Sequence, residues 1–151
     1  LTRNDPESCQ YSASSYMDFF VQPDSHETML ANDAEMLRDI YVGLPEDHVR
    51  DYLDVLTQPG ALKAALDWYR ANITDGPSPG IGLVAVPTMY IWSTGDTALC
   101  RDGADLTENY VIGPYRYEVI EGVSHWVPEQ AAERVSSLLI EHMRENCDVV
   151  F

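Results

Sequence analysis

An almost uninterrupted apolar run from Leu83 to Trp92 constrains the fold of this chain more than any other feature. Such a run is typical of a parallel β-strand that is buried on both faces by helices. Pro87 suits the start of the strand, where its missing N–H costs least. A strand of this kind needs neighbouring strands on both sides and helices on both faces, so the sequence predicts an α/β fold.

A second strand is predicted over residues 115–120, where Arg116 and Glu118 alternate with aromatic and aliphatic residues. This alternation favours a strand near the edge of a sheet, and an amphipathic helix opened by Pro128 follows it. Because an isolated pair of strands is marginal in water, we expect the rest of the sheet to lie in residues outside this chain. The start at Leu1 rather than Met also suggests a piece of a longer polypeptide.

Residues 1–72 have the pattern of helices separated by short breaks. Asp24 with Glu27, and Asn32 with Glu35, fit the capping-box spacing that satisfies the first free amides of a helix. Further apolar stripes at helical spacing follow.

The stretch 73–82 is rich in Gly and Pro and is predicted to be a loop. It divides the chain into a helical portion with its linker, residues 1–82, and an α/β portion, residues 83–151.

One carboxylate and one imidazole follow the two predicted strands. Asp96 lies in the polar turn after the first strand, and His125 lies 29 residues later in a Gly-Val-Ser-His turn after the second. Ligands of open α/β sheets bind outside the carboxyl ends of the strands, where both residues are expected. An Asp that accepts one imidazole N–H fixes the tautomer of a catalytic His. Taken alone, His125 fits a structural histidine equally well; Asp102 and Asp105 are rival acids, but they lie past the strand end.

The composition excludes several classes of partner. The formal net charge is −16, so the surface repels nucleic acid phosphates and anionic lipids, and neither nucleic acid nor a membrane is an expected partner. Cys9, Cys100 and Cys147 form neither a disulfide framework nor a metal pair, which favours unpaired structural thiols in a reducing, cytoplasmic compartment. No spacing of His, Cys and Asp predicts a zinc site, and no cofactor is expected.

Three motifs occur in an order that resembles the C-terminal half of an α/β hydrolase of the epoxide-hydrolase type. They are Pro59-Gly60-Ala61-Leu62 with Leu66-Asp67-Trp68-Tyr69-Arg70, Pro87-Thr88-Met89-Tyr90-Ile91-Trp92 with Gly95-Asp96, and Gly122-Val123-Ser124-His125-Trp126. The resemblance covers most of the chain. It implies that residues 1–82 are part of a helical cap with a linker and that residues 83–151 are the last part of the core.

The resemblance also implies roles for individual residues. Asp96 would be the acid of a catalytic triad and His125 its base. Tyr69 would be one of the cap tyrosines that donate a hydrogen bond to an epoxide oxygen, and Trp126 matches the aromatic residue that commonly follows the His. One departure is Asp67, where the family more often has Asn.

The nucleophile and the oxyanion hole of the family lie upstream of the cap, so we expect an N-terminal half of the same enzyme to supply them. Residues 76–80 formally match G-x-S-x-G, but Pro79 has no N–H to offer an oxyanion and no strand precedes Ser78. This stretch is therefore interpreted as linker. Cys100 follows the acid, which is the wrong chain order for a nucleophile, and Cys9 lies in the cap.

The predicted function is hydrolysis of a small apolar, ester or epoxide substrate through a covalent ester intermediate. Two alternatives stay open: a serine esterase or lactonase of the same fold, and a non-catalytic binding subunit that retains the fold. A small domain that folds by itself is a third. The sequence leaves self-association into a homo-oligomer undecided.

Overall fold

The computed structural model describes residues 5–73 and 82–146. Within these residues the chain forms two compact units, one inside residues 14–79 and one made of residues from 1–13 together with 80–151. We call them the helical unit and the sheet unit. The predicted linker Ser78 and the rest of 74–81 lie outside the described residues, as does Cys147.

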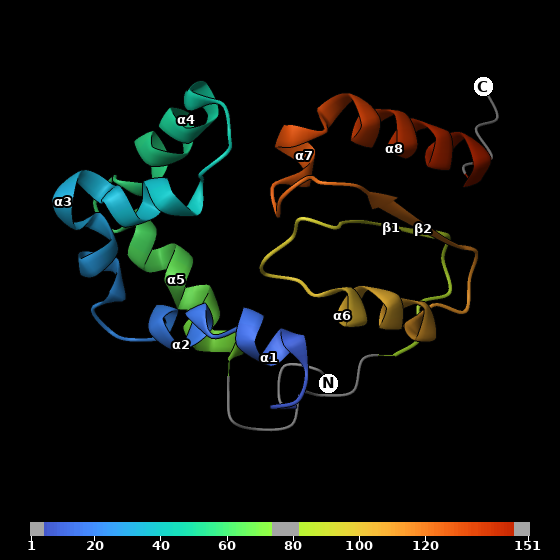
Figure 1. Ribbon diagram of the computed structural model, residues 1–151, viewed down its shortest axis with the longest axis horizontal. Helices are drawn as coiled ribbons and strands as arrows, with labels where there is room; N and C mark the ends of the chain where they lie inside the picture. Colours follow the sequence, from blue (N-terminus) through green and yellow to red (C-terminus); the bar gives the residue numbers. More distant parts are fainter. Residues whose placement is uncertain (1–4, 74–81, 147–151) are drawn as a thin grey trace. The chain divides into compact units, whose positions relative to one another are not determined.

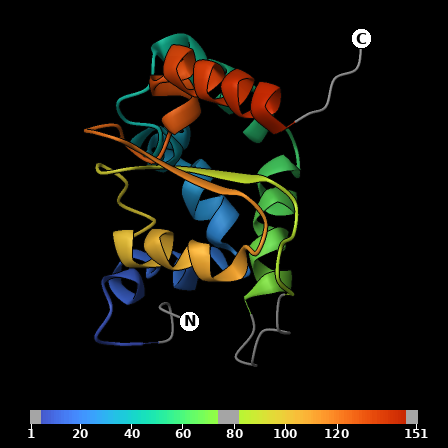
Figure 2. The ribbon, with the colours of Figure 1, turned by 90° about the vertical axis from the view of Figure 1, so that its right-hand side faces the viewer.

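The sheet unit contains two parallel strands, β1 (Thr88–Ser93) and β2 (Tyr115–Ile120), in a register that pairs Thr88 with Tyr115 and Ser93 with Ile120. Helices α7 (Val127–Gln130) and α8 (Ala132–Asn146) cover one face of the sheet. Helix α6 (Arg101–Asp105) and the 3₁₀ helix η2 (Leu106–Tyr110) cover the other, as Figures 1 and 2 show. Helix α1 (Cys9–Ala13) packs against α6. The prediction of parallel strands in an α/β fold is confirmed.

The first strand is shorter than the apolar run predicted. It begins at Thr88, directly after Pro87, and Val84 forms only a single bridge to Val111. Residues 82–86 are exposed, and most of β1 is half-buried rather than buried on both faces. The reason is that, within the described residues, β1 has a neighbour on one edge only, which is β2.

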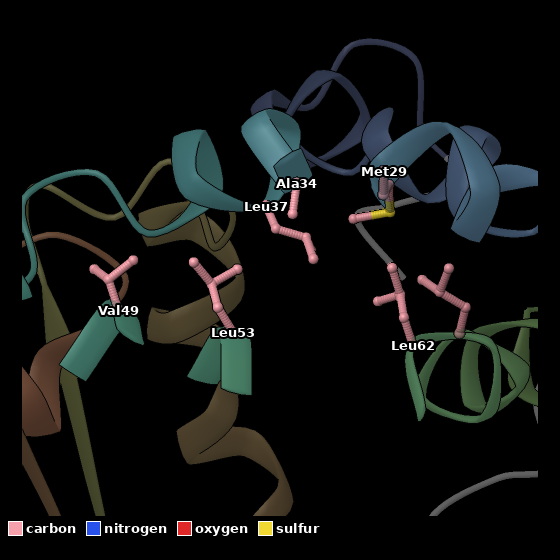
Figure 3. Packing of buried hydrophobic residues seen from close by; sticks show 7 residues of the cluster. Met29, Ala34, Leu37, Val49, Leu53 and Leu62 are labelled. Atoms are coloured by element: carbon pink, nitrogen blue, oxygen red, sulfur yellow. The ribbon is translucent and has the colours of Figure 1, made fainter. Parts of the chain in front are cut away.

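The helical unit consists of α2 (Tyr16–Phe20), α3 (Ser25–Ile40), α4 (Glu46–Leu56) and α5 (Ala61–Asn72). Its apolar stripes meet in one core, part of which is shown in Figure 3. The buried members of this core are Met29, Ala34, Leu37, Val49, Leu53, Leu62 and Leu66. The helical pattern predicted for this region is confirmed.

Helix α3 is interrupted in its middle. The backbone is extended at Ala31, and φ is positive at Asn32, Asp33 and Ala34. The capping box predicted at Asn32 therefore falls in a left-handed segment, which Asn and Asp tolerate better than most residues. At the start of α3, Asp24 occupies the cap position, but its side chain makes no capping hydrogen bond.

Cys9 and Cys100 form a disulfide, so the prediction of unpaired thiols is wrong for these two residues. They are 91 residues apart in sequence, but the packing of α1 beside α6 brings their Cα atoms to 6.2 Å, within disulfide reach. The argument for a reducing compartment depended on free thiols and is lost with them. Among the helices in the described part of the chain, none has the length and apolar character needed to cross a membrane.

Candidate active site

Asp96 and His125 are in direct contact at one edge of the sheet. Because β1 and β2 are parallel and end in register at Ser93 and Ile120, the turns that follow them leave the sheet side by side. The Nδ1 atom of His125 lies 3.0 Å from Oδ2 of Asp96 and 3.1 Å from Oδ1. The structure thus brings together the two residues that the sequence paired.

The Asp96 carboxylate is held in a fixed orientation. Its Oδ1 accepts the backbone N–H groups of Ala98 and Leu99, each at 2.8 Å, and its side chain is only 4% exposed. The indole N–H of Trp92 donates to the carbonyl oxygen of Leu99, which fastens the same turn to β1. The Asp96 carboxylate is therefore buried and fixed in place by hydrogen bonds.

The imidazole of His125 is more open than the acid, with 41% of its side chain exposed. When Nδ1–H donates to Asp96, the lone pair of Nε2 is free to accept a proton. The carboxylate also stabilises the imidazolium that forms after proton transfer. This arrangement can act as a general base on water or on a hydroxyl group.

Three consecutive residues at the end of β1 join the two turns. The buried Ser93 hydroxyl donates to the carbonyl oxygens of Val123 (2.7 Å) and Ser124 (2.9 Å). Thr94 donates to Glu121 and accepts the N–H of Gly122.

Gly95 completes this connection. Its N–H donates to the carbonyl oxygen of Val123 at 3.0 Å. A Cβ atom at Gly95 would lie 2.5 Å from that same oxygen, so only glycine permits this close approach. Sequence reasoning did not assign a role to Ser93, Thr94 or Gly95. The available signal was the abrupt change from an apolar strand to small polar residues.

Trp126 lies beside the histidine. Its ring meets the His125 ring edge-on, with centroids 5.4 Å apart and an angle of 74° between the planes. The N–H of Ser124 donates to Gln130 on α7, which holds the loop from its other side. Trp126 therefore contacts the His125 ring directly.

A cavity of about 330 Å³ opens beside the acid–base pair. Its wall is mainly apolar, and Asp96 and His125 are among the residues that line it. Burial raises the pKa of the Tyr90 phenol in this wall, and the nearby Asp96 carboxylate raises it further. The lining residues are Tyr90, Ile91, Trp92, Asp96, Leu99, His125, Val127, Pro128 and Val135.

Tyr69 belongs to the helical unit, on α5. Its ring packs edge-to-face against Phe20 at 5.1 Å and against Tyr16 at 6.4 Å between centroids. Its side chain is half-buried rather than enclosed in the core.

Asp67, which stands where the resembling family more often has Asn, forms ion pairs within α5. It forms ion pairs with Arg70 at 2.7 Å and with Lys63 at 3.1 Å. These hydrogen bonds, the one from Arg70 first, hold the pKa of the Asp67 carboxyl below its usual value. Arg70 also donates to the carbonyl oxygen of Gln22 and to Ser25, which ties α5 to the turn before α3.

The rival acids do not contact His125. Asp105 forms an ion pair with Arg101, one turn earlier on α6. Asp102 lies in the first turn of the same helix. Within the described residues, the carboxylate at the imidazole is that of Asp96.

Comparison with known proteins places these features in context. No family model matches the chain. The chain is 33% identical over 147 residues to the AB hydrolase superfamily protein YfhM of Bacillus subtilis, covering 89% of this chain and 49% of that protein. It is 27% identical over 148 residues to epoxide hydrolase 4 of Homo sapiens, covering 90% and 41% respectively. The chain thus spans about half the length of the curated relatives that it matches.

Solved structures of similar fold are also epoxide hydrolases. Bacillus megaterium epoxide hydrolase in complex with an inhibitor superposes with a TM-score of 0.78 at 20% identity, over 92% of this chain and 54% of that one. An epoxide hydrolase from metagenomes of hot environments gives a TM-score of 0.72 at 20% identity, over 91% and 52%. At these identities the likeness concerns the fold.

Proposed function

This chain belongs to the α/β hydrolases and corresponds to the C-terminal part of their fold, and we propose that it supplies the acid and the base of a nucleophile–histidine–acid triad. His125 is the proposed base and Asp96 the acid that orients it. The observation that carries this proposal is the contact of the imidazole Nδ1 with both oxygens of a buried carboxylate. The proposed reaction is hydrolysis of an epoxide through a covalent ester.

A first, nucleophilic step would form the ester. A carboxylate from an N-terminal segment attacks a carbon of the epoxide ring, the ring C–O bond breaks, and the ring oxygen becomes an alkoxide. Tyr69 is proposed to donate a hydrogen bond to this oxygen and to pass it a proton.

The second step would depend on the acid–base pair described above. His125 Nε2 removes a proton from water, the resulting hydroxide adds to the ester carbonyl carbon, and Asp96 stabilises the imidazolium. Collapse of the tetrahedral intermediate releases the diol and restores the carboxylate nucleophile. Of the two protons that come from the water, one goes to the leaving oxygen of the diol and the other returns to the Tyr69 phenolate, which restores the imidazole as well. The apolar cavity beside the pair suits a substrate with an apolar substituent.

The N-terminal half of the enzyme is the proposed partner of this chain. It would provide the nucleophile, the oxyanion hole and the strands next to β1. Two observations support this: β1 pairs only with β2 in the described residues, and the relatives are about twice as long as the chain.

The test is His125→Ala in the enzyme that joins this chain to its nucleophile-bearing half. Turnover should fall by about 10⁴-fold or more, and the covalent ester should accumulate and be visible by intact-protein mass spectrometry. His142→Ala is the matched control, since His142 lies on α8 with Asn146 as its neighbour and should leave turnover unchanged. Full turnover by His125→Ala would contradict the proposal.

A single turnover in water labelled with heavy oxygen identifies the nucleophile. An aspartate hands one of its own carboxylate oxygens to the product, so the first diol formed carries no label. A serine nucleophile would place the label in the first product, which would assign the chain to the esterase or lactonase alternative.

A further inference from the structure

A polar side chain from the beginning of the chain is buried beside the turn that carries the acid. Gln10 on α1 is only 8% exposed. Its Nε2 donates to the carbonyl oxygen of Ala98 at 2.8 Å, and its Oε1 accepts the N–H of Cys100 at 2.9 Å. Both partners are backbone groups, so the amide of Gln10 fixes the path of the main chain between residues 98 and 100.

The same turn holds the carboxylate. Asp96 accepts the N–H groups of Ala98 and Leu99, and these peptide groups adjoin those bonded by Gln10. The indole of Trp92 binds the Leu99 carbonyl from the strand side. A shift of this short turn would therefore move the two N–H groups that orient the acid.

A covalent bond keeps Gln10 in place. Its neighbour Cys9 is joined to Cys100, the residue whose N–H Gln10 binds. Helix α1 has five residues and is too short to be stable alone, so its position depends on such links. The disulfide and the glutamine side chain thus fasten α1 to the acid turn at adjacent positions.

We propose that Gln10 is a positioning residue for Asp96 and that the Cys9–Cys100 disulfide holds it in that position, so that reduction of the disulfide slows the step that uses His125. This inference rests on the proposed function. Gln10 is not among the residues that line the cavity, and its hydrogen bonds to Ala98 and Cys100 reach Asp96 through the acid turn. A displacement of about 1 Å at a catalytic group can cost on the order of 100-fold in rate, so a 10- to 100-fold effect is expected.

The first experiment separates the two chemical steps in the complete enzyme. In rapid-mixing measurements, Gln10→Leu should hydrolyse the covalent ester 10- to 100-fold more slowly, while the rate of ester formation stays within about twofold of the unchanged enzyme. A role in folding alone would lower the active fraction and leave the rate of ester hydrolysis intact. Gln58→Leu is the matched control, because Gln58 is exposed just after the end of α4 and its side chain donates to the carbonyl oxygen of Asp54 in that helix. Equal ester hydrolysis by the two variants would overturn the role of Gln10.

The second experiment reduces the disulfide with a dithiol. The dithiol gives two electrons and two protons, Cys9 and Cys100 become thiols, and the reagent becomes its own disulfide. Ester hydrolysis by the reduced enzyme should slow by about 10-fold and recover on reoxidation. The Cys9→Ser enzyme should be slow with or without the dithiol. An unchanged rate after complete reduction, verified by thiol counting, would overturn the role of the disulfide.

The two levels of inference can fail separately. If His125→Ala turns over normally, the proposed function fails. If His125→Ala is inactive while Gln10→Leu hydrolyses the ester at the normal rate, the proposed function stands and only the positioning role is wrong.

Discussion

The helical unit and the sheet unit are stabilised by different kinds of contact. Among the residues that the structure describes, seven buried apolar side chains from α3, α4 and α5 form one continuous core in the helical unit. Those of the sheet unit that are described as buried are fewer, namely Trp92, Ala104, Val127 and Leu138. Around its site, hydrogen bonds from Gln10 and from residues 93–95, together with a disulfide, hold the chain.

This difference suggests that the stability of the fold and the exact position of the catalytic side chains depend on different contacts. Apolar packing has no direction and tolerates volume-conserving changes, so it can stabilise a fold without fixing a side chain to a fraction of an ångström. Hydrogen bonds are directional, and a buried group that loses its partner costs about 1–3 kcal/mol. We therefore expect substitutions in the apolar core of the helical unit to change stability, and substitutions around Asp96 to change the rate of one chemical step.

The largest effect is expected for Asp96→Asn in the complete enzyme. The Asn Oδ1 can still accept the N–H groups of Ala98 and Leu99, which turns its NH₂ group toward Nδ1 of His125. The imidazole must then carry its proton on Nε2 and cannot accept one there. We expect a loss of about 10⁴-fold in turnover, as tautomer errors of this kind produce in other triads.

The check is the steady-state kcat together with the melting temperature. A kcat that falls by several orders of magnitude at a nearly unchanged melting temperature would support the separation of rate from stability. If the melting temperature falls sharply while kcat per folded molecule stays normal, Asp96 contributes to stability rather than to rate, and the proposed difference between the two units is wrong.

The opposite result is expected for Leu37→Ala in the helical core. Leu37 is 2% exposed, and removal of such a side chain leaves a cavity that costs about 2–5 kcal/mol. The melting temperature should fall by roughly 2–4 °C for each kcal/mol, measured by thermal unfolding. Ester hydrolysis per folded molecule should stay close to normal. The matched control is Val42→Ala, since Val42 is largely exposed and its truncation should change stability by less than about 0.5 kcal/mol.

Gly95→Ala tests the contact between the acid turn and the histidine loop. The added Cβ would lie 2.5 Å from the Val123 carbonyl oxygen and 3.0 Å from its carbon, so the two turns must move apart. Ester hydrolysis should slow by about 100-fold. The far-downfield proton resonance expected for Nδ1–H of His125 should weaken or disappear. Gly82→Ala is the control, because a Cβ there meets no atom within 4 Å; an equally active Gly95→Ala enzyme would show that the turns can adjust.

The sequence predicted the elements whose signal is local. The apolar and alternating runs located β1 and β2, and parallel strands necessarily end at one edge of the sheet, so Asp96 and His125 could be paired from their positions alone. The helical core was likewise visible as stripes of apolar residues at helical spacing.

The features that the sequence did not predict depend on contacts between residues that are far apart in the chain. Gln10 binds groups about 90 residues later in the chain, and nothing in the sequence around Cys9 distinguishes it from a free thiol. The length of β1 was predicted too large, because apolar composition does not show whether a strand has neighbours on both edges. The break in α3 includes Asn32, which was interpreted as a capping residue rather than as left-handed backbone.

The smallest expected effect concerns alkaline pH and the sheet. Burial, aided by the Asp105 carboxylate, raises the pKa of Tyr117 on β2 to about 12, against 10.0 for a free phenol. Between these values the unfolded chain has lost the phenol proton while the folded chain retains it, so unfolding releases a proton and rising pH favours unfolding. The stabilising contribution of Tyr117 is complete below pH 10 and is lost as pH rises toward 12.

Thermal unfolding of the complete enzyme and of its Tyr117→Phe variant, measured from pH 8 to pH 12 at constant ionic strength, checks this expectation. Phenylalanine has no proton to release, so the variant should lose less stability than the unchanged enzyme as the pH passes 10. A difference between the two melting temperatures that stays constant across this range would show that the phenol titrates alike in both states. The burial of Tyr117 in the sheet unit would then make no contribution to the loss of stability at alkaline pH.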